Sequence, residues 1–254
     1  MSEPPDAMEA EFDAVARWTE ELIRDLGEDS AIPAACRGSA SPAALGWLAD
    51  HLNLRADETF LDSGAGLGGP AAWLRREHGV TPVLCDPMRG ACAAAYRLFG
   101  LPTVVAWSQK LPFGTGAFPA AWCLGVLCTT ADQHQLLREL HRVLEPRGRL
   151  GLLVFVQMVD DLPQTPAGND FPTGNRLAQL LEAADFSVLA ERTTDQLAAP
   201  PQEWTRVVDA VEEELRRRHG TDPVWQQAQQ QQQAMVPLLQ DGLVAARLLV
   251  AQRR

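Results

Sequence analysis

The sequence of 254 residues is poor in lysine and tyrosine and has no long apolar run. Lys110 is its only lysine, and 22 Lys and Arg residues face 33 Asp and Glu, which gives a formal net charge of −11. Nucleic acid binds through clustered Lys and Arg, so this balance argues against a nucleic-acid partner. The sequence also lacks the roughly 18 consecutive apolar residues of a membrane span. The acidic start, residues 1–13, is unlike a secretory signal peptide, so we expect a cytoplasmic protein without a membrane partner.

The cysteines do not form a metal-ligand pattern. Five are present, without a CxxC pair, and several lie inside apolar stretches typical of strands or helices. Buried reduced thiols are therefore the interpretation that we prefer, and no metal site is expected. The five are Cys36, Cys85, Cys92, Cys123 and Cys128.

The most informative segment is ETFLDSGAGLGGPAAWL, residues 58–74. Residues 59–61 are typical of the end of a buried strand, Asp62 follows, and a glycine-rich run leads into a helix predicted to begin near Pro70. Free backbone N–H groups at a helix N-terminus attract polar ligand groups. Glycines let a ligand come close to the backbone where a Cβ would block it. The segment therefore predicts a cradle for a nucleotide-like ligand.

The glycine spacing alone leaves the ligand open. Gly64-x-Gly66-x-x-Gly69 satisfies the dinucleotide fingerprint, and Asp86 lies at the distance expected of a ribose-binding acid. A nicotinamide-dependent oxidoreductase and other nucleoside-binding proteins share this pattern.

Helical and strand patterns alternate along the chain. Continuous apolar strands between helices predict a doubly wound, Rossmann-like α/β fold whose mostly parallel sheet has seven strands. We expect an N-terminal tail, a helix and a lid loop in residues 1–42, one domain over residues 43–254, and a helical insert at about 200–240 that caps the site before the last strand. Strands are predicted at 59–61, 80–85, 102–107, 118–127, 149–156, 186–191 and 245–251, and helices at 8–26, 42–52, 70–78, 87–99, 132–144, 173–184, 200–218 and 222–240, with a loop at 28–40.

Three motifs together point to one family. Asp62 opens a DxGxGxG pattern, Leu-Pro-Phe stands at 111–113, and RVLEPRG stands at 142–148. In these motifs the chain resembles the class I S-adenosylmethionine-dependent methyltransferases, in particular their small-molecule branch, over about residues 43–155. The resemblance implies that S-adenosylmethionine donates a methyl group to O, N or C of a small molecule and leaves as S-adenosylhomocysteine. Specialised metabolism, no metal, and a monomer or homodimer are the further expectations.

The resemblance also implies which residues contact the cofactor. The glycine turn would border the methionine portion and the ribose, with Asp62 near the amino group, and Asp86 would accept hydrogen bonds from the ribose hydroxyls. The full set is Asp62, Gly64, Ala65, Gly66 and Gly68 in the turn, Asp86, Pro87 and Met88 after the second strand, Trp107, Ser108 and Gln109 near the adenine, and Leu124 and Gly125 after the fourth strand.

Two departures from the family pattern bear on the site. The acid that normally precedes Leu-Pro-Phe by four positions is Trp107 here, so adenine recognition falls to Ser108, Gln109, the backbone, or stacking on the indole. Many relatives carry a histidine after the fourth strand, where this chain has Cys128 and Thr129. That absence removes the readiest general base.

Two other residues are candidates for catalysis. Methyl transfer from a sulfonium is an in-line displacement, in which positioning supplies much of the acceleration and a base removes a proton from the acceptor where needed. His134 is a candidate base, although a polar surface residue in a first helical turn is the plainer interpretation. Asp170, on the loop after the fifth strand, would hold a cationic substrate or act as base, although loop acids are usually only solvated.

Two other functions remain to be compared with methyl transfer. One is a protein of this fold that binds the cofactor but catalyses another reaction, such as a cyclisation, or only binds. The other is the oxidoreductase, which the two later motifs disfavour. The chain also has no Tyr-x-x-x-Lys pair, because its only tyrosine is Tyr96 and its only lysine is Lys110.

Overall fold

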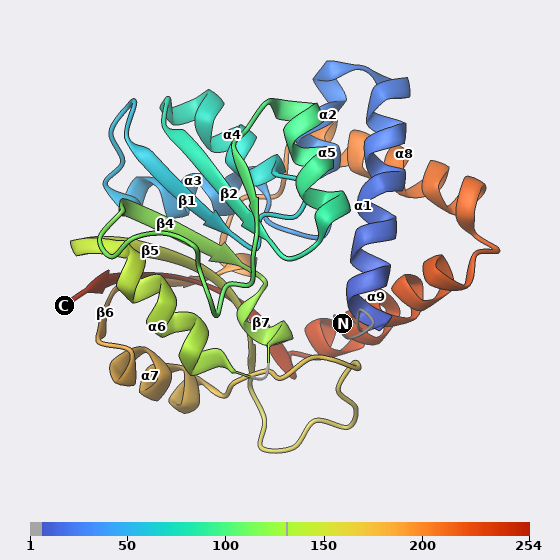
Figure 1. Ribbon diagram of the computed structural model, residues 1–254. Helices are drawn as coiled ribbons and strands as arrows, with labels where there is room; N and C mark the ends of the chain where they lie inside the picture. Colours follow the sequence, from blue (N-terminus) through green and yellow to red (C-terminus); the bar gives the residue numbers. More distant parts are fainter. Residues whose placement is uncertain (1–6, 131) are drawn as a thin grey trace, which may run out of the picture.

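The computed structural model describes residues 7–130 and 132–254 (Figure 1). Residues 1–6 of the predicted tail lie outside the described residues. In the described part, seven strands form one sheet in the order β3-β2-β1-β4-β5-β7-β6. β1 to β5 run parallel to one another, and β7 is antiparallel to both β5 and β6, so the predicted doubly wound, mostly parallel sheet is confirmed. The strands are β1 (Thr59–Ser63), β2 (Thr81–Asp86), β3 (Thr103–Val105), β4 (Phe118–Leu124), β5 (Leu144–Gln157), β6 (Phe186–Thr193) and β7 (Val244–Arg253).

The central strands are apolar on both sides because helices cover both faces of the sheet. Phe60 of β1 and Trp122 of β4 lie on one face, with their rings edge to face at a centroid distance of 5.0 Å. They pack with residues of α3 (Pro42–Leu52) and α4 (Gly69–His78), next to α5 (Arg89–Phe99). Leu61 and Cys123 point to the other face, under α6 (Gln133–Val143) and α7 (Gly174–Ala183). Figure 1 shows these two layers above and below the sheet.

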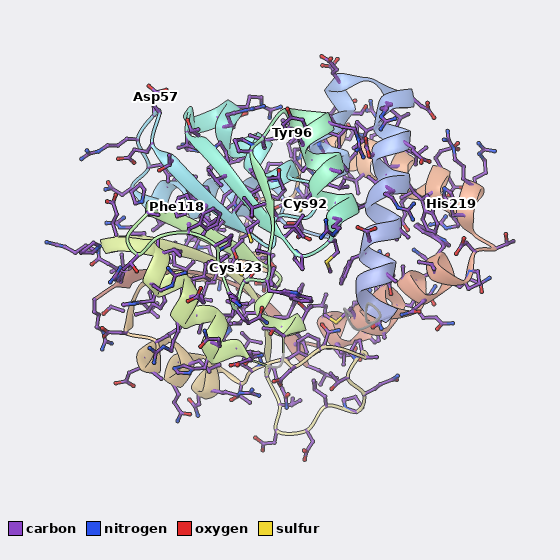
Figure 2. All side chains as sticks on the ribbon, in the orientation of Figure 1. Asp57, Cys92, Tyr96, Phe118, Cys123 and His219 are labelled. Carbon is purple, nitrogen blue, oxygen red and sulfur yellow. The ribbon has the colours of Figure 1, made fainter. Side chains whose placement is uncertain are left out.

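Four further helices form a cap. They are α1 (Ala7–Leu26), α2 (Ala31–Ala35), α8 (Gln202–His219) and α9 (Pro223–Gln240). They share an apolar cluster of their own, in which Leu22 of α1, Val211 of α8 and Trp225 of α9 are buried. The α8–α9 pair stands between β6 and β7, where the helical insert was predicted. Trp18 of α1 stacks on His219 of α8 at 4.0 Å, within the cap that Figure 2 shows on the side away from Asp57.

Several boundaries differ from the predictions. The predicted loop at 28–40 contains α2, whose five residues are too few to form a helix in isolation and pack against α4 and α8. β5 begins at Leu144, before the predicted start at 149, because residues 145–148 form a bulge in a longer strand, with Arg147 at φ 66°. β3 has three residues and ends before Trp107.

The predicted state of the cysteines is confirmed, since all five are free and buried. Figure 2 shows Cys123 near the middle of the sheet and Cys92 on α5. No helix in the described part of the chain combines the length and apolar composition that crossing a membrane requires.

Candidate functional site

The glycine turn follows β1, the strand that lies between β2 and β4 in the sheet. It stands where the strand order of the sheet reverses. In doubly wound sheets this switch point is where ligands bind. Gly64, Gly66 and Gly68 all have positive φ, at 78°, 53° and 75°. A Cβ on Gly64 would lie 2.2 Å from Cγ2 of Val126, and one on Gly68 would lie 2.7 Å from Cδ2 of Leu84. A Cβ on Gly66 would meet no atom within 4 Å, so the middle glycine borders open space while the other two border packed side chains.

Asp86 at the end of β2 ties the turn to the neighbouring loop. Its Oδ2 accepts a hydrogen bond from Gly66 N at 2.8 Å, and its Oδ1 accepts one from Met88 N at 2.9 Å. Burial raises the pKa of this carboxyl, while the two backbone bonds favour its charged form. A carboxylate oxygen accepts more than one hydrogen bond, so Asp86 keeps capacity for ligand hydroxyls. Pro87 and Met88 are half-buried beside it.

Asp62 is buried at the end of β1, and its Oδ2 has no hydrogen-bond partner in the described part of the chain. Burial raises the pKa of Asp62 to about 7, and the nearby indole of Trp122, its register partner in β4, offsets part of this effect. The indole Nε1 also lacks a partner among the described residues. An unpartnered buried carboxyl oxygen is costly unless a ligand donates to it.

The residues after β3 divide into buried and exposed ones. Ser108 is buried, and its Oγ accepts a hydrogen bond from Oγ of Ser63 at 2.8 Å. Gln109 donates through Nε2 to Oγ1 of Thr130. Trp107 is 50% exposed. Of the three predicted adenine contacts, Trp107 therefore offers an open aromatic face, while the Ser108 hydroxyl oxygen and the Gln109 amide nitrogen already bond to protein atoms.

The end of β4 forms the other wall of the turn. Leu124 and Ala65 are buried, and Gly125 has φ 76° and donates its N–H to the carbonyl of Leu153 at 2.9 Å. Val126, the next residue, is the side chain that Gly64 accommodates. These contacts bring the predicted residues of β4 and the glycine turn together.

The two candidate catalytic residues have protein partners. His134, in the first turn of α6, has Nε2 3.4 Å from the carbonyl oxygen of Ala183 in α7, in a shallow surface pocket of about 290 Å³. Asp170 forms a two-point ion pair with Arg176, both distances being 2.9 Å. Neither contact is to the glycine turn, so both assignments stay predictions without a geometric argument for them.

Two motifs of the sequence are joined to each other. Arg142 of α6 donates to the carbonyl oxygens of Phe113 at 2.7 Å and Leu111 at 2.9 Å, and Glu139 accepts the N–H of Leu111 at 2.8 Å. Glu139 also forms an ion pair with Arg142. The Leu-Pro-Phe segment is therefore held by the helix that ends in the Arg-Val-Leu motif.

Sequence patterns did not predict the contacts that the cap makes with the cradle. Asp13 of α1 accepts a hydrogen bond from Gly90 N of α5 at 2.6 Å. A Cβ on Gly69, at the start of α4, would lie 2.5 Å from the carbonyl carbon of Ala35 in α2. Helix α2 falls in a predicted loop, and no local signal links residue 13 to residue 90. Such contacts depend on tertiary packing.

The cradle fits the cofactor that the resemblance implies. S-adenosylmethionine has an amino group that Asp62 could bind and ribose hydroxyls that suit Asp86. Gly66, where a Cβ would meet no atom within 4 Å, donates its N–H to Asp86. The cradle thus offers two carboxyls and, at Gly66, a stretch of backbone without a neighbouring side chain.

Comparisons with known proteins point to methyltransferases. Residues 61–152 match a family model described as "Methyltransferase domain". The methyltransferase GfsG of Streptomyces halstedii is 30% identical over 154 residues, covering 57% of this chain and 55% of that protein. The 27-O-demethylrifamycin SV methyltransferase of Amycolatopsis mediterranei is 30% identical over 158 residues, covering 59% and 55%. The matches thus span about half the length of these relatives.

Solved structures share the fold. The [4+2]-cyclase SpnF has a TM-score of 0.66 at 22% identity, covering 82% of this chain and 79% of that one. The geranyl diphosphate C-methyltransferase of Streptomyces coelicolor, in complex with Mg²⁺, geranyl diphosphate and S-adenosyl-L-homocysteine, has a TM-score of 0.64 at 18% identity, covering 84% and 79%.

Proposed function

Because the chain belongs to the class I S-adenosylmethionine-dependent methyltransferases, we propose that it transfers the methyl group of S-adenosylmethionine to O, N or C of a small molecule. The observation that carries this proposal is the glycine turn, in which a Cβ on Gly66 would meet no atom within 4 Å, Asp86 accepts the N–H of Gly66, and the buried Oδ2 of Asp62 has no partner in the described part of the chain. The bound cofactor would supply an electrophilic methyl group on a sulfonium. The chain's own residues would hold and orient it.

Each part of the cradle has a role in this proposal. Asp62 would bind the amino group, which would give its unpartnered Oδ2 a donor. Asp86 would bind the ribose hydroxyls while its bonds to Gly66 and Met88 hold it in place. Trp107 would stack on the adenine with its exposed indole, in place of the acid that relatives have there.

The acceptor is proposed to be a small molecule of specialised metabolism. The relatives include proteins named for 27-O-demethylrifamycin SV and for geranyl diphosphate, and both names state small acceptors. The net charge of −11 disfavours a nucleic-acid partner. Five free, buried cysteines suit the reducing cytoplasm, where we propose that the protein acts as a monomer or homodimer.

Catalysis in this proposal depends chiefly on positioning. Holding the acceptor atom in line with the methyl group lowers the barrier without a dedicated base. His134 and Asp170 remain the proposed bases, and each would have to leave its contact with Ala183 or Arg176 to act. Loss of either side chain should therefore reduce turnover far less than loss of Asp86.

A second candidate function is a reaction other than methylation, such as a cyclisation, on the same cofactor-bound fold. It is favoured by the engaged state of both candidate bases and by the fold that the chain shares with a [4+2]-cyclase. Formation of S-adenosylhomocysteine separates the two functions, because a cyclisation does not consume the methyl donor.

Calorimetric titration with S-adenosylmethionine and S-adenosylhomocysteine tests the proposal, with a nicotinamide dinucleotide as control ligand. We expect micromolar binding of both sulfur ligands, at least about tenfold weaker for Asp86→Ala, and none of the dinucleotide. A screen with a labelled methyl donor then identifies acceptors. Wild-type protein that binds neither sulfur ligand would overturn the proposal. Binding without release of S-adenosylhomocysteine on any substrate that the protein converts would favour the second function.

A further inference from the structure

Helix α5 begins without a cap of its own. Met88 stands at its N-cap position, and no side chain near it in sequence accepts the free N–H groups of the first turn. The carboxylate of Asp13, which belongs to α1, accepts the N–H of Gly90 at 2.6 Å instead. A carboxylate at a helix N-terminus satisfies a free donor and interacts favourably with the helix dipole. A side chain 77 residues away thus provides the cap.

A second contact fixes the register of the two helices. Glu20 of α1, whose side chain is 2% exposed, accepts two hydrogen bonds from Arg97 of α5 at 2.6 and 2.5 Å. Glu20 follows Asp13 by seven residues, and Arg97 follows Gly90 by seven residues. Seven residues are about two helical turns, so both contacts lie on one face of each helix, and α1 and α5 run parallel in register. Figure 1 shows α1 alongside α5.

Gly90 is needed for this close approach. A Cβ at position 90 would lie 2.5 Å from Oδ1 of Asp13, well inside van der Waals contact. The φ of Gly90 is not in the left-handed region, so the requirement is for space and not for backbone freedom. The chain therefore has a residue without a side chain where α1 meets the first turn of α5.

The capped end of α5 belongs to the cofactor cradle. Asp86, which bonds to Met88 N and Gly66 N, precedes Gly90 by four residues. A continuous path of backbone and hydrogen bonds thus leads from Asp13 through Gly90 and Met88 to Asp86 and the glycine turn. Asp13 is also close enough to Asp86 to raise the pKa of that carboxyl.

We propose that Asp13 is a positioning residue for cofactor binding: by capping α5 from α1, it sets the Asp86–Met88 segment in the conformation that receives the ribose and adenine. Docking of α1 and occupation of the cradle are then coupled, each favouring the other. This inference rests on the proposed binding of S-adenosylmethionine. It assigns to the cap a part of the cofactor site that neither the motifs nor the family match, which begins at residue 61, includes.

The test compares variants by affinity for S-adenosylhomocysteine and by thermal unfolding. Asp13→Ala should bind about tenfold more weakly than wild type, and Asp13→Asn, which keeps an acceptor oxygen, should stay within about threefold. Glu20→Gln is the matched control, because it weakens the other α1–α5 contact away from the cradle. It should lower the unfolding temperature with affinity within about twofold of wild type.

Gly90→Ala provides a second, independent variant. Alanine is the better helix former, so propensity alone predicts a more stable protein. The contact with Asp13 predicts instead that Gly90→Ala loses affinity for S-adenosylhomocysteine as Asp13→Ala does. The double variant Asp13→Ala/Gly90→Ala should bind no more weakly than either single variant. Hydrogen exchange in α1 should slow when S-adenosylhomocysteine binds the wild type.

The outcomes separate this inference from the function on which it rests. Wild type that fails to bind S-adenosylhomocysteine overturns the proposed function and the coupling with it. If the wild type binds, two results would overturn the positioning role alone. One is an equal loss of affinity in Asp13→Ala and Glu20→Gln, and the other is a double variant Asp13→Ala/Gly90→Ala whose loss is the sum of the two single losses.

Discussion

Two carboxyl side chains, Glu11 and Asp62, are buried with one oxygen each that has no hydrogen-bond partner in the described part of the chain. Burial raises the pKa of each to about 7. Asp62 lies in the cradle, where a ligand's amino group would serve as partner. Glu11 lies in the cap, on the α1 side that meets Gln227 of α9. At the residue scale, both groups make stability depend on pH.

Glu11→Gln should make the protein's stability less sensitive to pH. The pKa of Glu11 is about 7 in the folded protein and near 4.5 when unfolded, so its contribution is fully present below pH 4.5 and is lost as pH rises through 7. Wild type should therefore lose stability between pH 5 and 8. The variant should lose less, by on the order of 2 kcal/mol. Urea denaturation at both pH values measures this, with the exposed Glu21→Gln on the same helix as control. Equal losses in wild type and Glu11→Gln would contradict the expectation.

At the scale of elements, the glycine turn assigns different tasks to neighbouring glycines. Gly64 and Gly68 leave room for Val126 and Leu84, so they serve the packing of the turn. Gly66 faces open space, which the proposed cofactor would occupy. All three have positive φ, which alanine adopts at a cost of about 1 kcal/mol or more. In the proposed function, the same motif thus combines a folding requirement with a binding requirement.

Gly66→Ala and Gly64→Ala should fail in different ways. We expect Gly66→Ala to fold, with stability lowered by about 1 kcal/mol for its φ, and to bind S-adenosylhomocysteine at least about tenfold more weakly because its Cβ occupies ligand space. Gly64→Ala should lose more stability, since its Cβ would lie 2.2 Å from Val126. Truncation in Gly64→Ala/Val126→Ala should restore part of that stability. Calorimetric titration and urea denaturation separate the two effects, and a Gly66→Ala protein with wild-type affinity would refute the division of tasks.

At the scale of the whole molecule, side-chain contacts link helices of the cap that are far apart in the sequence. Arg37, which follows α2, forms an ion pair with Glu212 of α8 at 2.6 Å, and both side chains are 17% exposed. Glu212 also accepts a hydrogen bond from Gln229 of α9 at 2.8 Å. This network connects the N-terminal helices to the late insert. It completes the cap that α1 attaches to α5.

Removal of Arg37 should weaken the cap as a unit. Arg37→Ala leaves the charge of Glu212 largely buried without its partner, which should lower the free energy of unfolding by about 2 kcal/mol. Arg206→Ala, which removes an exposed ion pair with Glu203 on the same helix, should change it little. Urea denaturation compares the two. Hydrogen exchange in α8 and α9 should accelerate only for Arg37→Ala. Similar effects of both variants would show that the network around Glu212 stabilises the cap no more than an exposed ion pair does.

Much of this molecule follows from the sequence alone. The apolar strand segments, the glycine turn and the caps at Ser41, Asp132, Thr173 and Asp222 are local patterns, and they determine the alternation of helices and strands because their physical causes act within a few residues.

Only the tertiary structure decided how the cap meets the cradle. Asp13 approaches Gly90 and Arg37 approaches Glu212 across 77 and 175 residues, and no local preference encodes such distances. It also decided that His134 faces α7 and that Asp170 pairs with Arg176, which spacing along the chain could not reveal. Local sequence determines the elements because backbone preferences are short-range. Side-chain partners depend on where the packing of apolar faces brings those elements together.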